Sequence, residues 1–131
     1  MKHSIKIGFL FVALCGLGIV SSCTKSSLDH KLQGNWKKIN LADVSDSTNV
    51  ETWQFNSGGN LFIYNKHNSG ETDTTKLAYT IDSYQKFVIS ATASGQNLPY
   101  ICKWVIVKLN SKMMRMESRS GGLFIIEFEK E

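Results

Sequence analysis

Residues 53–61 read WQFNSGGNL, and this stretch decides the fold class of the chain. Trp53 and Phe55 flank the polar Gln54, which is the period-two alternation of a half-buried β-strand. The residues that follow are Asn, Ser and Gly, the residue types of tight turns. Apolar residues resume at Leu61. The stretch therefore predicts two antiparallel strands joined by a short turn.

The same texture repeats along the chain from Gly34 onward. Short runs of β-branched, aromatic and apolar residues alternate with Gly, Asn, Ser and Asp, and no segment shows a long apolar period of 3.6 residues. Eight such runs cover residues 34–41, 50–55, 61–66, 71–81, 86–91, 100–109, 113–118 and 123–129. This rhythm, with short connections, predicts an all-β fold: a single small antiparallel meander barrel of about eight strands. The longest connection, residues 42–50, is a candidate loop at its mouth.

Alternation also indicates which side of each strand faces inward. The run 100–109 is apolar at both parities, and we expect Trp104 and Ile106 to face inward because the opposite orientation would bury Lys103 without a partner. The candidates to line the barrel interior are Trp36, Trp53, Phe55, Tyr79, Phe87, Trp104, Met114, Met116, Phe124 and Phe128.

The N-terminus has the pattern of a secretory signal. Lys2 and Lys6 form a short positive region, and residues 7–20 are apolar and uncharged. A transmembrane helix needs about 20 apolar residues, so this run is too short to span a bilayer and fits the apolar core of a signal peptide. The small residues Ser21 and Ser22 follow, as a peptidase site requires.

The sequence Val-Ser-Ser-Cys at residues 20–23 resembles the lipobox of bacterial lipoproteins. The resemblance implies cleavage before Cys23, acyl chains on its sulfur and amine, and a membrane anchor. Cys15 is the rival, but it follows Leu14 rather than a small residue. In the Gram-negative lipoproteins that this segment resembles, an Asp directly after the Cys holds the protein at the inner membrane. Thr24 stands there instead, so the resemblance favours the outer membrane.

These features divide the chain into a signal peptide over residues 1–22, a lipidated Cys and polar tether over residues 23–33, and a barrel domain over residues 34–131. Within the tether, Leu28 and Leu32 are spaced to form one helical turn that caps the domain.

Cysteine content and charge exclude several classes of protein. After loss of Cys15 and lipidation of Cys23, Cys102 alone remains, which excludes an internal disulfide and a cysteine zinc cluster. Removing Lys2 and Lys6 from a chain of net charge +4 leaves +2, and the remaining basic residues are scattered. No basic run interleaved with aromatic residues is present, so we expect no nucleic-acid partner.

The first predicted strand contains LQGNWKKI at residues 32–39, in which Leu32, Gly34 and Trp36 resemble the opening signature of the lipocalins and of bacterial lipocalin-like lipoproteins. WQFNSGGNL, YTI at residues 79–81 and KWVIVKLNSKMMRM at residues 103–116 also resemble the bacterial domain. The resemblance implies a lipocalin-like barrel. The lipocalin cysteine pair, Thr-Asp-Tyr landmark and C-terminal helix are missing, so the resemblance hardly extends to a ligand.

Two functions are compatible with such a barrel. The inward aromatic residues form either an apolar calyx for a small apolar or amphipathic ligand, or a filled core, because an eight-stranded barrel is just wide enough for either. With a filled core, the barrel would be an interaction module whose surface binds a protein at the cell envelope. The partners expected are therefore the membrane, a small ligand or an envelope protein.

The residues do not favour an enzyme. His30 lies in the tether and His67 in a turn, and neither is beside a plausible nucleophile. Cys102 lies in an apolar run, as a structural thiol would. The segment DVSDSTN at residues 43–49 carries oxygen ligands but lacks the spacing of a calcium loop. We therefore expect no catalytic site, no metal and no cofactor, and we expect Glu127 and Glu129 to face solvent.

Overall fold

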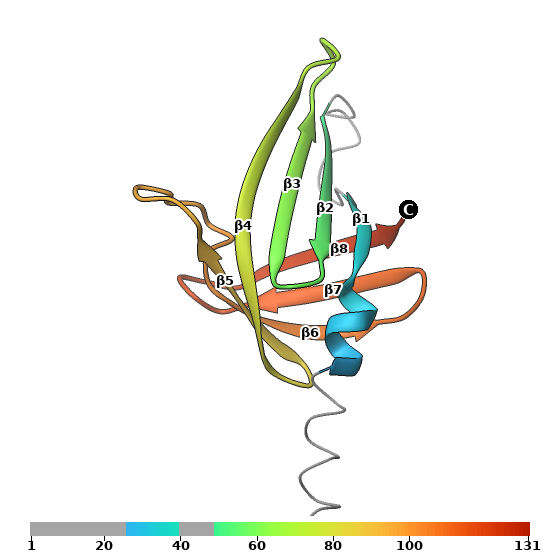
Figure 1. Cartoon of the computed structure of the whole chain (residues 1–131). Helices are drawn as coiled ribbons and strands as arrows, with labels where there is room; N and C mark the ends of the chain where they lie inside the picture. The colour runs from blue at the N-terminus through green and yellow to red at the C-terminus, as the bar shows by residue number, and fades with distance from the viewer. Residues whose placement is uncertain (1–25, 40–48) are drawn as a thin grey trace, which may run out of the picture.

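The computed structural model describes residues 26–39 and 49–131. They form a closed antiparallel barrel in which each strand pairs with its sequence neighbours and β8 closes on β1 (Figure 1). The strands are β1 (Gly34–Ile39), β2 (Val50–Asn56), β3 (Asn60–Lys66), β4 (Thr72–Ser83), β5 (Lys86–Ala91), β6 (Lys103–Leu109), β7 (Met113–Ser118) and β8 (Phe124–Lys130). A short helix over residues 26–32 precedes β1. The predicted all-β meander barrel of eight strands is confirmed.

The WQFNSGGNL stretch forms the β2–β3 hairpin, with Asn56 opposite Asn60. Gly59 has a φ of 80°, and a Cβ on it would lie 2.7 Å from the carbonyl oxygen of Tyr79. The Tyr79 amide donates to the Gly59 carbonyl at 2.9 Å, so β4 lies directly against this turn. Glycine is therefore required here both for the positive φ and for the close backbone approach.

Most strand boundaries follow the predicted runs, with one clear exception. The run predicted over 100–109 is a strand only from Lys103, because Tyr100, Ile101 and Cys102 lie in a turn before it. The end of the run 34–41 and most of the loop 42–50 fall on residues 40–48, outside the described residues.

The inward faces of the strands fill the barrel with large side chains. Trp104 and Ile106 face inward as expected, since both are buried while Lys103, Val105 and Val107 are exposed. Nine of the ten candidate lining residues are buried, and their rings pack edge to face, as Phe55 does on Phe87 with centroids 5.9 Å apart. The nine are Trp36, Trp53, Phe55, Tyr79, Phe87, Trp104, Met114, Met116 and Phe128.

Phe124 is the exception, because it is not buried in the barrel interior. Its side chain is 48% exposed although it shares the parity of the buried Ile126 and Phe128. Phe124 is the first residue of β8 and pairs with Ser118, the last residue of β7. It therefore stands at the rim, where parity still points it toward the axis but no described element covers it.

The helix closes the opposite end of the barrel. Leu28 and Leu32 are buried, and the Trp36 indole Nε1 donates to the Leu32 carbonyl at 2.8 Å. The expected helical turn is confirmed, and the part of the tether segment from residue 26 to 33 packs as the floor of the folded domain.

No helix within the described residues is long and apolar enough to cross a membrane. The predicted signal peptide, Cys15 and the predicted lipidation site at Cys23 lie outside the described residues.

Candidate functional site

The two ends of the barrel differ in what their polar side chains contact. We call the helix end, with the turns after β2, β4 and β6, the base. We call the opposite end the mouth; there β1 ends, β2 begins, and residues 92–102 connect β5 to β6 (Figure 1).

At the base, polar groups complete the closure of the barrel. The Tyr79 hydroxyl lies 2.7 Å from Asp29 Oδ1 and 2.8 Å from the Asn56 carbonyl oxygen, so its proton is held between two acceptors. Burial, and then the hydrogen bond to the Asp29 carboxylate, raise the pKa of Tyr79 well above its usual value. Lys130 Nζ donates to the Gln33 carbonyl at 2.8 Å and lies over the Trp36 ring. These groups bind the helix to the strands.

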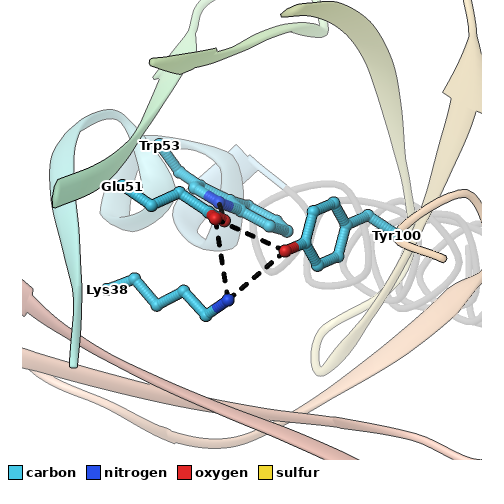
Figure 2. Close-up of polar contacts among 4 residues, drawn as sticks. All are labelled: Lys38, Glu51, Trp53 and Tyr100. Carbon is cyan, nitrogen blue, oxygen red and sulfur yellow. Dashed lines mark hydrogen bonds and ion pairs between the residues drawn. The ribbon is translucent and has the colours of Figure 1, made fainter. Parts of the chain in front are cut away.

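At the mouth, a charged pair faces into the barrel. Lys38 shares the inward parity of Trp36 on β1, and Glu51 shares that of Trp53 on β2. Lys38 Nζ lies 3.6 Å from Glu51 Oε2, and the side chains are 23% and 15% exposed. Tyr100, from the β5–β6 connection, completes the group (Figure 2).

The polar contacts of this group converge on the Glu51 carboxylate (Figure 2). Lys38 Nζ donates to the Tyr100 hydroxyl at 3.3 Å, and that hydroxyl donates to Glu51 Oε2 at 3.4 Å. The other carboxylate oxygen accepts the Trp53 Nε1 hydrogen at 2.6 Å. Glu51 is therefore tied firmly to the indole, whereas Lys38 is held by two long contacts. Burial and the Glu51 carboxylate raise the pKa of Tyr100, so its hydroxyl is protonated at neutral pH. We call Lys38, Glu51 and Tyr100, with the Trp53 ring beneath them, the mouth cluster.

The β5–β6 connection holds Tyr100 in place. Trp104 Nε1 donates to the Tyr100 carbonyl at 3.0 Å, and the Tyr100 ring packs edge-on against Trp53 with centroids 4.9 Å apart. Leu98 and Ile101 also pack against the core. The turn that displaced the predicted start of β6 therefore folds inward and places an aromatic hydroxyl beside the charged pair.

Nine of the ten lining residues predicted from sequence meet in one core, but three members of the mouth cluster were not among the ten. Lys38 and Glu51 could have been found, because each lies two residues from a predicted inward tryptophan in Trp-x-Lys and Glu-x-Trp. Tyr100 could not, since its place depends on a turn that the sequence predicted as strand.

The two histidines, Cys102 and the two glutamates of β8 are not members of the mouth cluster. His67 lies at the β3–β4 turn, with Nε2 2.6 Å from Asp73 Oδ2, and His30 is exposed on the helix. Cys102 Sγ is 3.2 Å from Ser118 Oγ beneath the β5–β6 connection. Glu127 and Glu129 are on the outer face, where they pair with Arg115 and Lys37 as expected for solvent-facing residues.

The segment DVSDSTN falls mainly outside the described residues. Among the described residues, no group of three or more His, Cys, Asp or Glu side chains is placed to hold a metal ion.

Comparison with known proteins supports the fold. No protein-family model and no curated protein sequence matches the chain. Among solved structures, a lipocalin-like protein from Bacteroides uniformis superposes with a TM-score of 0.53 over 77% of this chain and 98% of that one, at 12% sequence identity. The chain therefore shares the closed eight-stranded barrel of a lipocalin-like protein.

Proposed function

We propose that this protein is a membrane-anchored lipoprotein whose barrel binds a small amphipathic ligand at the mouth, without catalysing a reaction. The observation that supports this proposal is the mouth cluster, in which charged side chains face inward above an aromatic core. The closed barrel supports a binding protein, and the lipobox resemblance at Cys23 supports the membrane anchor.

Charged side chains that face into a barrel reduce its stability, because they lose contact with water. Removing an ammonium and a carboxylate from water costs several kcal/mol per ion when burial is complete, and a pair of apolar residues commonly stabilises a core as well or better. The Lys38–Glu51 pair is partly exposed, so its own cost is lower, but it still takes two inward positions from the core. A recognition role explains this placement better than stability does.

The geometry favours a ligand with a hydrogen-bond-accepting or anionic head. The ammonium of Lys38 has three donors, and its contacts at 3.3 Å and 3.6 Å are long enough to be exchanged for a ligand oxygen. The rings of Trp53 and Tyr100 offer apolar surface beside it. Because the interior below is filled by side chains, the ligand would sit at the mouth and not in a deep apolar calyx.

Native mass spectrometry of protein purified from its own cells tests this proposal. We expect a small-molecule adduct on the wild-type protein, lost in Lys38→Met. Lys37→Met is the matched control, because Lys37 is the neighbouring residue on the outer face and pairs with Glu129 at 3.8 Å. Absence of any adduct, or equal loss in both variants, would contradict ligand binding at the mouth.

The anchor has its own test. Cys23→Ser should release the protein from the membrane fraction, and fractionation should place the wild-type protein at the outer membrane. A variant that stays membrane-bound, mature in size and correctly located would refute the anchor.

A second function is favoured by the outer surface. Val105, Val107 and Ile125 are exposed on β6 and β8, with Leu123 and Phe124 at the adjoining rim. Together with the filled interior, they support an interaction module that binds an envelope protein. A photo-crosslinking residue at Val107 should then give one dominant adduct in cells, and the same residue at Thr52 on the opposite outer face should not.

A further inference from the structure

A groove lies at the base of the barrel, away from the mouth cluster. It has a volume of about 330 Å³ and runs between the helix, the β4–β5 turn and β6. Leu28 and Ile106 form its buried wall. Tyr84 and Val107 stand beside it with 65% and 52% of their surfaces exposed, so the groove has apolar surface at its edge.

The groove is basic as well as apolar. Lys31 from the helix and Lys108 from β6 line it, and both are exposed. Neither forms an ion pair with another described residue, and the described lining residues include no carboxylate. The combination of two free ammonium groups, a tyrosine and a valine matches the interfacial zone of a bilayer, where aromatic rings and basic side chains meet anionic headgroups.

The position of the groove in the chain points to the same occupant. The described part of the helix starts at residue 26, three residues after Cys23. Three extended residues span at most about 10 Å. An acyl anchor on Cys23 would therefore hold the bilayer close to the helix, and Lys31 and Tyr84 lie along this end of the barrel.

We propose that this groove is a membrane-docking surface that binds the headgroups of anionic phospholipids. Lys31 and Lys108 contact the phosphates, Tyr84 inserts at headgroup level, and the barrel is held with its base on the bilayer and its mouth turned away. The inference rests on the proposed anchor at Cys23. Each basic residue near an anionic surface contributes about 1 kcal/mol, so two lysines cannot recruit the protein alone but can orient a barrel that is already tethered.

Contact quenching tests the orientation in the intact lipoprotein. The lipidated protein is reconstituted in vesicles of equal phosphatidylglycerol and phosphatidylcholine that include a lipid with a nitroxide on its headgroup. One variant carries Tyr84→Trp and its matched control carries Phe124→Trp, at the exposed rim of the mouth. The native Trp36, Trp53 and Trp104 are at most 1% exposed, so they give a shared background that the nitroxide does not reach.

We expect the emission of the indole at position 84 to be quenched several-fold more than that of the indole at position 124. Adding Lys31→Gln and Lys108→Gln, or replacing phosphatidylglycerol with phosphatidylcholine, should remove most of the difference. A concentration of 1 M salt should do the same, because it shortens the screening length to about 3 Å.

The failures of the anchor and of the docking surface are distinguishable by flotation. Protein that does not float with the vesicles refutes the anchor and, with it, this inference. Protein that floats but is quenched equally at both positions refutes the docking surface alone. Quenching at position 84 that is unchanged in pure phosphatidylcholine refutes recognition of anionic headgroups.

Discussion

The base and the mouth of this barrel both contain lysine, tyrosine and tryptophan side chains, but these side chains make different kinds of contact. At the base, Tyr79, Trp36 and Lys130 direct their polar atoms to backbone carbonyls or to Asp29, and each contact joins the helix or its neighbouring turn to a strand. At the mouth, Lys38 and Tyr100 direct theirs to Glu51 and to each other. The base contacts join the helix to the barrel, whereas the mouth contacts join side chains of β1, β2 and the β5–β6 connection to one another.

This difference separates stability from recognition within one small domain. At the base, Trp36 and Tyr79 each donate a hydrogen bond of 2.8 Å to a backbone carbonyl, and both side chains are buried. The contacts of the Lys38 ammonium at the mouth are longer, at 3.3 Å and 3.6 Å, and its side chain is partly open to water. We therefore expect substitutions at the base to change the free energy of unfolding, and substitutions at the mouth to change binding.

The largest effect is expected for Trp36→Ala at the base. Trp36 is fully buried, and its removal leaves a cavity and an unpaired Leu32 carbonyl. The free energy of unfolding should fall by about 3–5 kcal/mol, the usual cost of truncating a buried aromatic side chain. Urea denaturation followed by circular dichroism measures it, and a loss under about 1 kcal/mol would show that the helix end does not close the core.

Tyr79→Phe should have the next largest effect. It keeps the ring but removes the donor shared by Asp29 and the Asn56 carbonyl. The cost should be about 1–3 kcal/mol, because buried acceptors lose their partner. Tyr64→Phe is the matched control: its hydroxyl donates to Gln54 on the outer face, and we expect a change within about 0.5 kcal/mol.

The same hydroxyl predicts a loss of stability in alkali. The pKa of Tyr79 is raised in the folded protein, mainly by burial and then by Asp29, while in the unfolded chain it is about 10. The unfolded state then binds fewer protons above pH 10, so this stabilisation is complete below pH 10 and is lost as pH rises toward the folded pKa. Tyr79→Phe should flatten the fall in denaturation midpoint above pH 10; an unchanged slope would contradict the assignment. The pKa of Tyr100 is also raised, so we expect a smaller fall in the denaturation midpoint above pH 10 to remain in the Tyr79→Phe variant.

Lys38→Met should change stability little. The pair with Glu51 is partly exposed and 3.6 Å long, so its removal should alter the free energy of unfolding by about 1 kcal/mol or less. The outer Lys37→Met should change it by less still, because Lys37 and Glu129 are largely exposed. A loss at Lys38 as large as that at Tyr79 would mean that the mouth cluster closes the fold as the base does.

The sequence predicted the barrel because its strands alternate cleanly and its turns carry Gly and Asn. Parity placed Trp53, Phe55 and Met116 inward correctly, since each lies within a strand that neighbours cover on both sides. Parity did not predict the exposure of Phe124, because alternation reports the direction of a side chain but not its position along the barrel.

The site was harder to predict than the fold. Alternation points Lys38 and Glu51 inward, but the cost of burying a charge predicts that such residues face solvent. The position of Tyr100 depends on the path of the β5–β6 connection. Contacts of Tyr100 with Trp53, which is distant in sequence, and with Trp104 hold that path. Such tertiary contacts are not written in local periodicity.

The three buried indoles allow the most direct test of the claim that the mouth recognises the ligand. Trp53 Nε1 bonds to Glu51 in the mouth cluster, Trp104 Nε1 bonds to the Tyr100 carbonyl, and Trp36 Nε1 bonds to Leu32 at the base. Titration with octanoate, a carboxylate with a short apolar chain, can be followed by the nitrogen–hydrogen resonances of the three indoles. We predict that Trp53 shifts most, Trp104 less and Trp36 not at all. A Trp36 shift as large as that of Trp53, or no shift of Trp53 at saturating octanoate, would contradict recognition at the mouth.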